Sequence, residues 1–136
     1  MKNDSHSKFL NLLFQFSFVF GFLGVALGAF GAHALKSQFG TYEMEIWNKA
    51  VFYLLTHTVV AITSGILYLQ FGDRLLLVAM TTLLLGAFLF AGSLFCFALS
   101  KIRFFVVITP FGGLSMLLGW IFLLSSSLKG RSQKPD

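Results

Sequence analysis

The sequence predicts an all-α protein, a bundle of four transmembrane helices. Of its 136 residues, 57% are hydrophobic and 11% are charged, whereas about a quarter of the residues in soluble domains are charged. The apolar residues form four blocks, and each block is long enough to cross a hydrocarbon core about 30 Å thick. We therefore expect one membrane domain over residues 9–124, with spans at 9–32, 50–71, 75–99 and 104–124.

The first span follows a polar N-terminal segment, residues 1–8. The span exceeds the roughly 7 to 15 apolar residues of a secretory signal peptide, and three further spans follow it, so we expect it to be retained. Its glycines recur at steps of three and four, which places them on one stripe of a helix: Gly21, Gly24, Gly28 and Gly31. Each glycine costs roughly 1 kcal/mol relative to alanine in a helix. The stripe therefore predicts a seam along which another helix packs closely.

The second helix is expected to begin before its apolar part, in the headgroup region. Gly40 and Thr41 have the pattern of a turn and an N-cap. Glu43 would then lie in the first turn, where a carboxylate is stabilised by the positive end of the helix dipole. Tyr42 and Trp47 are typical of the aromatic belt at a membrane interface.

Residues 50–71 are the most polar of the four spans. A helical face of graded polarity leads into them: Glu43, Trp47, Tyr53 and His57. Because an ionisable residue inside a membrane is a functional hypothesis by default, this face either lines a proton or solute path or is buried against neighbouring helices. In the second case a neutral His57 would bridge helices by hydrogen bonds. For His33, at the end of the first span, we expect a capping or headgroup contact.

The third and fourth spans are connected by short turns, which makes neighbouring spans antiparallel. Pro110 removes a backbone donor and frees the carbonyl four residues earlier, so we expect a kink at the Thr109–Pro110 step. Small residues then form a second packing stripe, Gly112, Ser115 and Gly119, and Gly113 is also expected to serve helix packing. Residues 109–113 could instead form a broken-helix binding element, as in transporters. Residues 125–136 are predicted to be a disordered basic tail.

The net charge of +5 does not predict a nucleic-acid partner, because the ten Lys and Arg residues flank the spans and do not form one basic face. Four spans place both termini on one side of the membrane. That side carries six of the ten basic residues, so the positive-inside rule predicts that both termini are cytoplasmic. The lipid bilayer is the expected partner.

The sequence contains no recognisable catalytic, cofactor-binding or metal-ligating set. No Ser or Cys is accompanied by a base and an orienting acid, and no phosphate-binding glycine loop follows a strand. His33 and His57 differ in expected depth by roughly 15 Å and lack a third ligand. We therefore expect no enzymatic activity, no cofactor and no metal.

Four motifs together carry a family resemblance. They are LGAFGAHALK at residues 27–36, W-x-x-A-x-x-Y-x-x-x-H from Trp47 to His57, GSL at 92–94 and TPFGGLSMLLGW at 109–120. In this order, over residues 15–124, the chain resembles the YgdD-like family of small bacterial membrane proteins. The resemblance implies a four-span inner-membrane protein from a family of unknown function. The third span departs from it at Ala91 and Cys96, where a polar or aromatic residue would be expected.

Two functional hypotheses follow. The small-residue stripes suggest a protein that acts through helix contacts, as an accessory or assembly partner in a larger membrane complex or as a homo-oligomer. The alternative is a small-solute or proton permease formed by an oligomer and using the region around His57.

Overall fold

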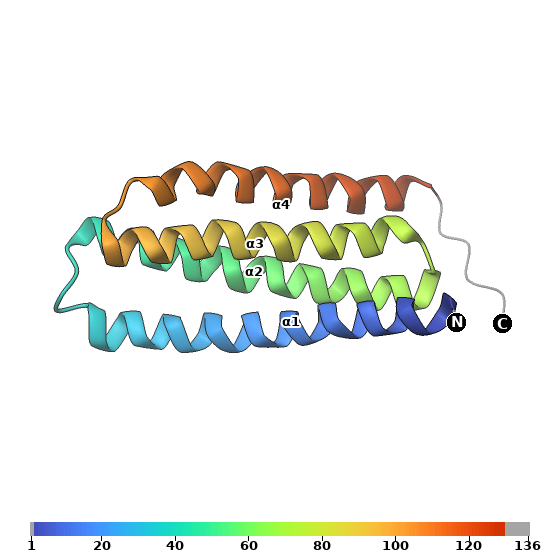
Figure 1. Ribbon diagram of the computed structural model, residues 1–136, viewed down its shortest axis with the longest axis horizontal. Coiled ribbons are helices and arrows are strands. Elements are labelled where there is room, and N and C mark those ends of the chain that lie inside the picture. Colours follow the sequence, from blue (N-terminus) through green and yellow to red (C-terminus); the bar gives the residue numbers. More distant parts are fainter. Residues whose placement is uncertain (1, 130–136) are drawn as a thin grey trace.

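Four long helices make up the computed structural model, which describes residues 2–129 and the side chains of residues 6–129 (Figure 1). They are α1 (Lys2–Phe30), α2 (Thr41–Phe71), α3 (Arg74–Ser100) and α4 (Phe104–Leu128), and a π-helical turn, η1 (Gly31–Leu35), extends α1. Each of the four is long and apolar enough to cross a membrane. The predicted all-α bundle of four spans is confirmed.

The turns between the helices are fixed by their caps. Gly72 ends α2 in the left-handed region, with φ of 71°, and its N–H donates to the Tyr68 carbonyl at 2.8 Å. Asp73 then caps α3 by accepting the Leu75 N–H at 3.0 Å. Lys101 ends α3 with a φ of 59°, a conformation that normally favours glycine. These tight turns bring consecutive helices back alongside each other.

Two helix starts differ from the sequence expectations. Residues from Lys2 onward already belong to α1, so the polar N-terminal segment is part of the first helix as far as it is described. In α2 the N-cap is Gly40, whose backbone is extended, and Thr41 is the first helical residue. The N-cap role predicted for Thr41 is therefore wrong, because the chain turns into the helix one residue earlier.

The end of α4 also differs from the prediction. The helix continues through Leu128, so residues 125–128 are not part of a disordered tail. Ser126 is buried, and its hydroxyl donates to Oδ2 of Asp73 at 2.6 Å. This bond ties the last turn of α4 to the α2–α3 turn. Residues 130–136 of the predicted tail lie outside the described residues.

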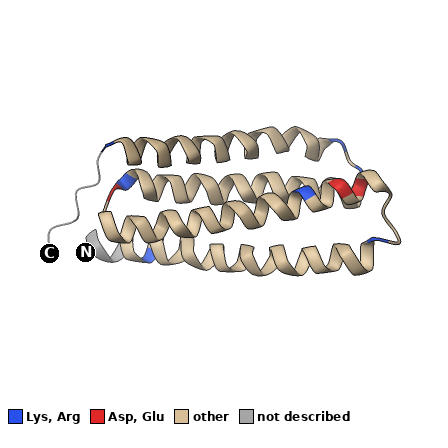
Figure 2. Ribbon diagram, turned by 180° about the vertical axis from the view of Figure 1, so that it is seen from behind, with Lys and Arg blue, Asp and Glu red and all other residues tan. Residues whose placement is uncertain are grey.

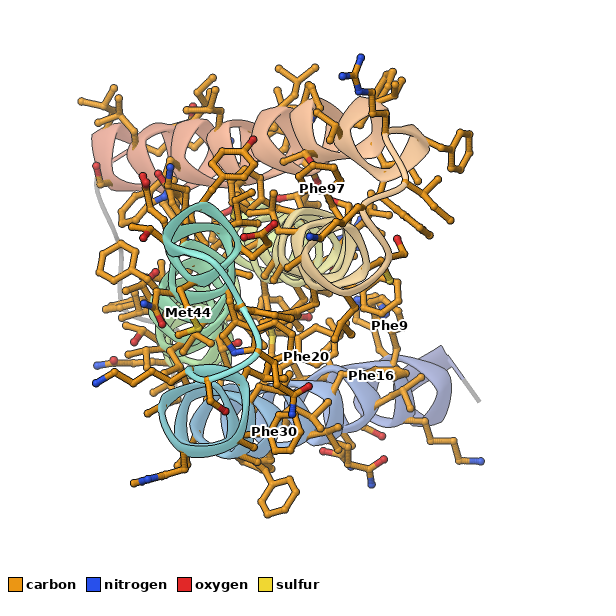
Figure 3. All side chains as sticks on the ribbon, turned by 90° about the vertical axis from the view of Figure 1, so that its left-hand side faces the viewer. Phe9, Phe16, Phe20, Phe30, Met44 and Phe97 are labelled. Atoms are coloured by element: carbon orange, nitrogen blue, oxygen red, sulfur yellow. The ribbon has the colours of Figure 1, made fainter. Side chains whose placement is uncertain are left out.

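The helices form three layers. α2 and α3 lie side by side in the middle, and α1 and α4 cover opposite faces of this pair (Figures 1 and 3). α3 packs against all three other helices. The buried side chains form two clusters: one nearer the η1 end, which includes Trp47, Ala50, Leu54, Ala87 and Ala91, and one nearer the termini, which includes Leu10, Leu13, Ala61, Met80 and Leu83. Phe20 fills space between α1 and the middle layer (Figure 3).

The glycine stripe of α1 is a seam against α2. Methyl groups added to three of its glycines would contact α2 side chains, at 2.7 Å from Leu55 Cγ for Gly24, 3.3 Å from Val51 Cγ1 for Gly28 and 2.5 Å from Trp47 Nε1 for Gly31. A methyl group at Gly21 would meet nothing within 4 Å, so Gly21 takes no part in the seam between α1 and α2. At that level α1 turns towards α3, where Phe20 stacks on Phe88 with ring centroids 6.0 Å apart.

A second seam joins α3 to α4. A methyl group added to Gly112 would lie 2.8 Å from Phe90 Cα and 2.9 Å from the Gly86 carbonyl oxygen. One added to Gly119 would lie 2.6 Å from Leu83 Cγ. A methyl group at Gly113 would approach nothing closer than the Phe90 ring, at 3.9 Å. Gly112 and Gly119 thus serve close packing, whereas the packing role predicted for Gly113 is wrong.

Charged residues lie towards the two ends of the bundle, with Lys49 of α2 the farthest inward, and the middle of the bundle carries none among the described residues (Figure 2). The first residues of α1 and the last of α4 lie at the same end (Figure 1). At the opposite end, Lys101 pairs with Glu43 at 3.0 Å and Lys49 with Glu45 at 3.7 Å. The arrangement is that of a multi-pass membrane protein. Which end faces the cytoplasm stays a prediction.

Candidate functional site

His57 lies near the middle of α2 and makes a cross-helix hydrogen bond to α4. Its Nδ1 is 3.0 Å from the Tyr53 carbonyl oxygen, which can only accept a hydrogen bond. Nδ1 therefore carries the proton, and Nε2 accepts the indole N–H of Trp120 at 3.3 Å. Thr56 Oγ1, which donates to the Phe52 carbonyl, lies 3.2 Å from Nδ1 as a second acceptor. The bonds together specify a neutral imidazole with a defined tautomer.

A cleft of about 370 Å³ lies between α2 and α4 beside this imidazole. It is lined from α2 by Tyr53 and His57, from α3 by Phe90, and from α4 by Gly113, Met116, Leu117 and Trp120. Tyr53 stacks on His57 with centroids 5.5 Å apart and meets Phe90 at 4.6 Å. Trp120 meets His57 edge to face and is 48% exposed. The wall of the cleft is therefore aromatic, with one imidazole as its polar centre.

Trp47 does not belong to an interfacial belt. It is 2% exposed, and its indole N–H donates to the Leu27 carbonyl at 2.9 Å. Its ring packs against Phe95 of α3, with centroids 4.6 Å apart. The prediction is wrong because Gly31, with no side chain, leaves room for the indole at the α1–α2 seam. Trp47 is a core residue that joins three helices.

The polar face predicted along α2 is split by the structure. Glu43 pairs with Lys101 beyond the end of α3, whereas Trp47, Ala50 and Leu54 enter the core. His57 is ten residues from Trp47, which turns it about 80° around a helix with 3.6 residues per turn. Glu43 and His57 are therefore separated by packed apolar side chains, and the buried alternative accounts for most of this face.

Thr109 and Pro110 lie inside an uninterrupted helix. Because α4 is continuous through Pro110, the broken-helix alternative is wrong, and the expected kink stays a prediction. Thr109 Oγ1 lies 2.8 Å from Ser93 Oγ on α3 and 3.3 Å from the Phe105 carbonyl. Ser115 also crosses this interface by donating to the Thr82 carbonyl at 2.8 Å. These hydroxyls bond α4 to α3 beside the glycine seam.

His33 lies in η1, exposed and far along the chain from the middle of α2. The capping or headgroup contact expected for it stays a prediction. Within the part of the chain that the structure describes, no group of three or more His, Cys, Asp and Glu side chains could hold a metal ion. Of the two departures in the third span, Ala91 is fully buried and Cys96 is exposed.

Trp120 and Phe90 are neighbours of His57 that were not predicted from the sequence. One signal was available for Trp120. Because α2 and α4 run in the same direction, residues equally far from their helix starts lie at similar depth. His57 and Trp120 each lie sixteen residues after the first residue of their helices. Phe90 had no comparable signal, since one of many phenylalanines in an apolar span is not distinguished by its position.

Most of the chain is similar to known proteins. Residues 27–113 match the model of a family described as a protein of unknown function, DUF423. The chain belongs to the DUF423 family. The DUF423 match includes Gly28 and Gly31 of the α1–α2 seam and, of the cleft, Tyr53, His57, Phe90 and Gly113.

Relatives of this DUF423 protein are membrane proteins by name. The chain is 36% identical over 114 residues to the UPF0382 inner membrane protein YgdD of Escherichia coli (strain K12), covering 84% of this chain and 87% of that protein. It is 38% identical over 109 residues to the UPF0382 membrane protein SH2409 of Staphylococcus haemolyticus (strain JCSC1435), covering 79% and 87%. No solved structure matches the chain. The predicted family and inner-membrane location are confirmed.

Proposed function

We propose that this DUF423 protein acts through helix contacts within the bilayer, as an accessory or assembly partner of a larger membrane complex or as a homo-oligomer. The observation that supports this is the separation of its polar groups. His57 bonds with Trp120, Ser93 with Thr109, and Ser115 with a carbonyl of α3, each at a different place. Between Glu43 and His57, α2 contributes apolar core residues. Over the residues that the structure describes, a single copy therefore offers contact surface and no continuous polar route.

The glycine seams do not supply that contact surface, because they are used inside the bundle. The outward faces of α1 and α4 consist of large apolar side chains, among them Phe18, Phe22, Phe111 and Ile121. Such faces contact lipid by default, and a partner helix can replace lipid there through close packing. The middle layer also exposes large apolar side chains, such as Phe52 on α2 and Phe88 on α3, so the outward faces of α1 and α4 are the first surfaces to test.

Photo-crosslinking in native membranes tests this proposal. Benzoylphenylalanine is placed at Phe22 on α1 or at Phe111 on α4, which are 73% and 66% exposed. We expect irradiation to yield a covalent product with a second polypeptide, or with a second copy of the chain, from at least one position. Unirradiated membranes serve as the control. Recovery of the monomer alone from both variants would contradict the proposal.

A second candidate function is an oligomeric permease. The observation that favours it is the position of His57 at an open cleft, so that a second copy could complete a path that one copy lacks. We expect proteoliposomes containing such a permease to dissipate a proton gradient faster than empty liposomes, and His57→Ala to return the rate to that of empty liposomes. Equal rates for the wild type and His57→Ala would assign the histidine a structural role.

A further inference from the structure

The cleft between α2 and α4 has space that packing does not require. Gly113 lines it, yet a methyl group there would meet only the Phe90 ring, at 3.9 Å. The adjacent Gly112 is different, since a methyl group there would lie 2.8 Å from the Phe90 backbone. Gly112 is thus required by the α3–α4 seam, whereas Gly113 keeps the cleft open. The volume of about 370 Å³ falls within the range of small-molecule sites, about 300–1,000 Å³.

The polar centre of the cleft is a paired acceptor and donor. His57 Nε2 accepts from the Trp120 N–H at 3.3 Å, which is a long hydrogen bond. Trp120 is half exposed at the cleft, so its ring has room to move. Once the Trp120 ring has moved outward and separated the two nitrogens, a hydroxyl group between them can donate to Nε2 and accept from the indole N–H. An ether or a carbonyl oxygen can only accept, and would leave Nε2 without a donor.

The remaining surface of the cleft defines the rest of the ligand. Tyr53, Phe90 and Trp120 present aromatic rings from three helices, and such rings favour a planar ring as their partner. The described helix surfaces at this depth carry no charged side chain, and a charged ligand would be costly there. The cleft lies among the membrane-spanning parts of α2 and α4, so its ligand reaches it from the bilayer.

We propose that this cleft is a binding site for a neutral, lipid-soluble molecule with a hydroxyl group on an aromatic ring, that is, an alkylphenol type of ligand. The hydroxyl bridges His57 Nε2 and the Trp120 N–H, the ring lies against Tyr53 and Phe90, and the alkyl chain extends along the outside of the bundle. The inference is independent of whether the protein also has a partner in the membrane.

The test uses the full-length protein in nanodiscs and a diazirine-bearing alkylphenol. We expect saturable photolabelling of peptides that contain His57 or residues 113–120. We expect 4-nonylphenol to compete about tenfold better than 4-nonylanisole, its methyl ether, because the ether cannot donate to Nε2. The comparison needs no mutant, so it stands even if a variant fails to fold. Equal competition by the phenol and the ether would overturn the proposal.

Two variants locate the site. Gly113→Leu fills the cleft, so labelling is expected to fall at least tenfold while the unfolding temperature stays near that of the wild type. His57→Phe keeps a ring but removes the acceptor, and it is expected to abolish the advantage of the phenol over the ether. Unchanged labelling in a folded Gly113→Leu protein, or an unchanged phenol preference in His57→Phe, would contradict the assignment.

Discussion

Replacing Gly112 with Leu is expected to leave little folded protein in the membrane. The first added carbon would lie 2.8 Å from Phe90 Cα and 2.9 Å from the Gly86 carbonyl oxygen. Both obstacles are backbone atoms, which cannot move aside as a flexible side chain can. Overpacking of this kind costs about 3 kcal/mol or more when the helices must separate. The amount of protein in purified membranes and its thermal unfolding in mild detergent measure the effect.

Gly92→Leu is the matched control for this substitution. Gly92 lies in the middle part of α3, and an added methyl group there would meet nothing within 4 Å. We expect this variant to accumulate normally and to be as stable as the wild type or up to about 1 kcal/mol more stable, because it removes a helical glycine that no neighbour crowds. Similar unfolding temperatures for Gly112→Leu and Gly92→Leu would mean that the α3–α4 seam is not closely packed.

Replacing Trp47 with Ala is expected to lower the free energy of unfolding by a large amount. Its side chain is 2% exposed and lies between Gly31 of α1 and Phe95 of α3. Removal of a buried Trp to Ala costs about 3–5 kcal/mol. Trp47→Phe retains most of the apolar volume but loses the bond to the Leu27 carbonyl, so we expect a smaller loss, of which about 1 kcal/mol comes from the hydrogen bond. Detergent-phase thermal unfolding ranks the three proteins.

Trp120→Ala provides the comparison for Trp47→Ala. Trp120 is 48% exposed and makes one long hydrogen bond, so its truncation is expected to cost less than half as much. Equal losses from the two tryptophans would indicate that Trp47 is not a core residue, and would restore the interfacial position that its residue type suggested.

Composition and hydropathy were sufficient to predict the four spans, because each span is a long apolar run between charged ends. They were also sufficient for the seam at Gly24, Gly28 and Gly31, since helical periodicity puts these glycines on one side. Gly21 has the same periodicity but no contact. Where a seam ends depends on the angle at which two helices cross, and the sequence of one helix does not contain that angle.

Residue-type preferences were misleading where a specific neighbour overrides them. Tryptophan is enriched at membrane interfaces, but Trp47 is drawn into the core by the space over Gly31 and by the Leu27 carbonyl. The prediction of a disordered tail from residue 125 was wrong for a similar reason. Three consecutive serines suggest a tail, yet Ser126 is buried against Asp73, 53 residues earlier in the chain. Both contacts join distant segments, and local patterns do not encode such pairings.

The cleft itself could be predicted only in part. An intramembrane histidine marked α2 as the helix to examine, and counting residues from the helix starts would have brought Trp120 to the same depth. The open volume depends on the difference between Gly112 and Gly113, which are identical in sequence and adjacent. The two differ in which way their Cα–H bonds face. Gly112 faces the backbone of α3, whereas Gly113 faces the cleft.

The central position of α3 has a consequence for biosynthesis. α1 and α2 enter the membrane first and can pair through their glycine seam without any later segment. Trp47 nevertheless lacks one of its packing partners, Phe95, until α3 has been inserted. α4 contacts mainly α3, so it has nowhere to dock before that helix is in place. We therefore expect the four-helix bundle to form only after the third helix has entered the membrane.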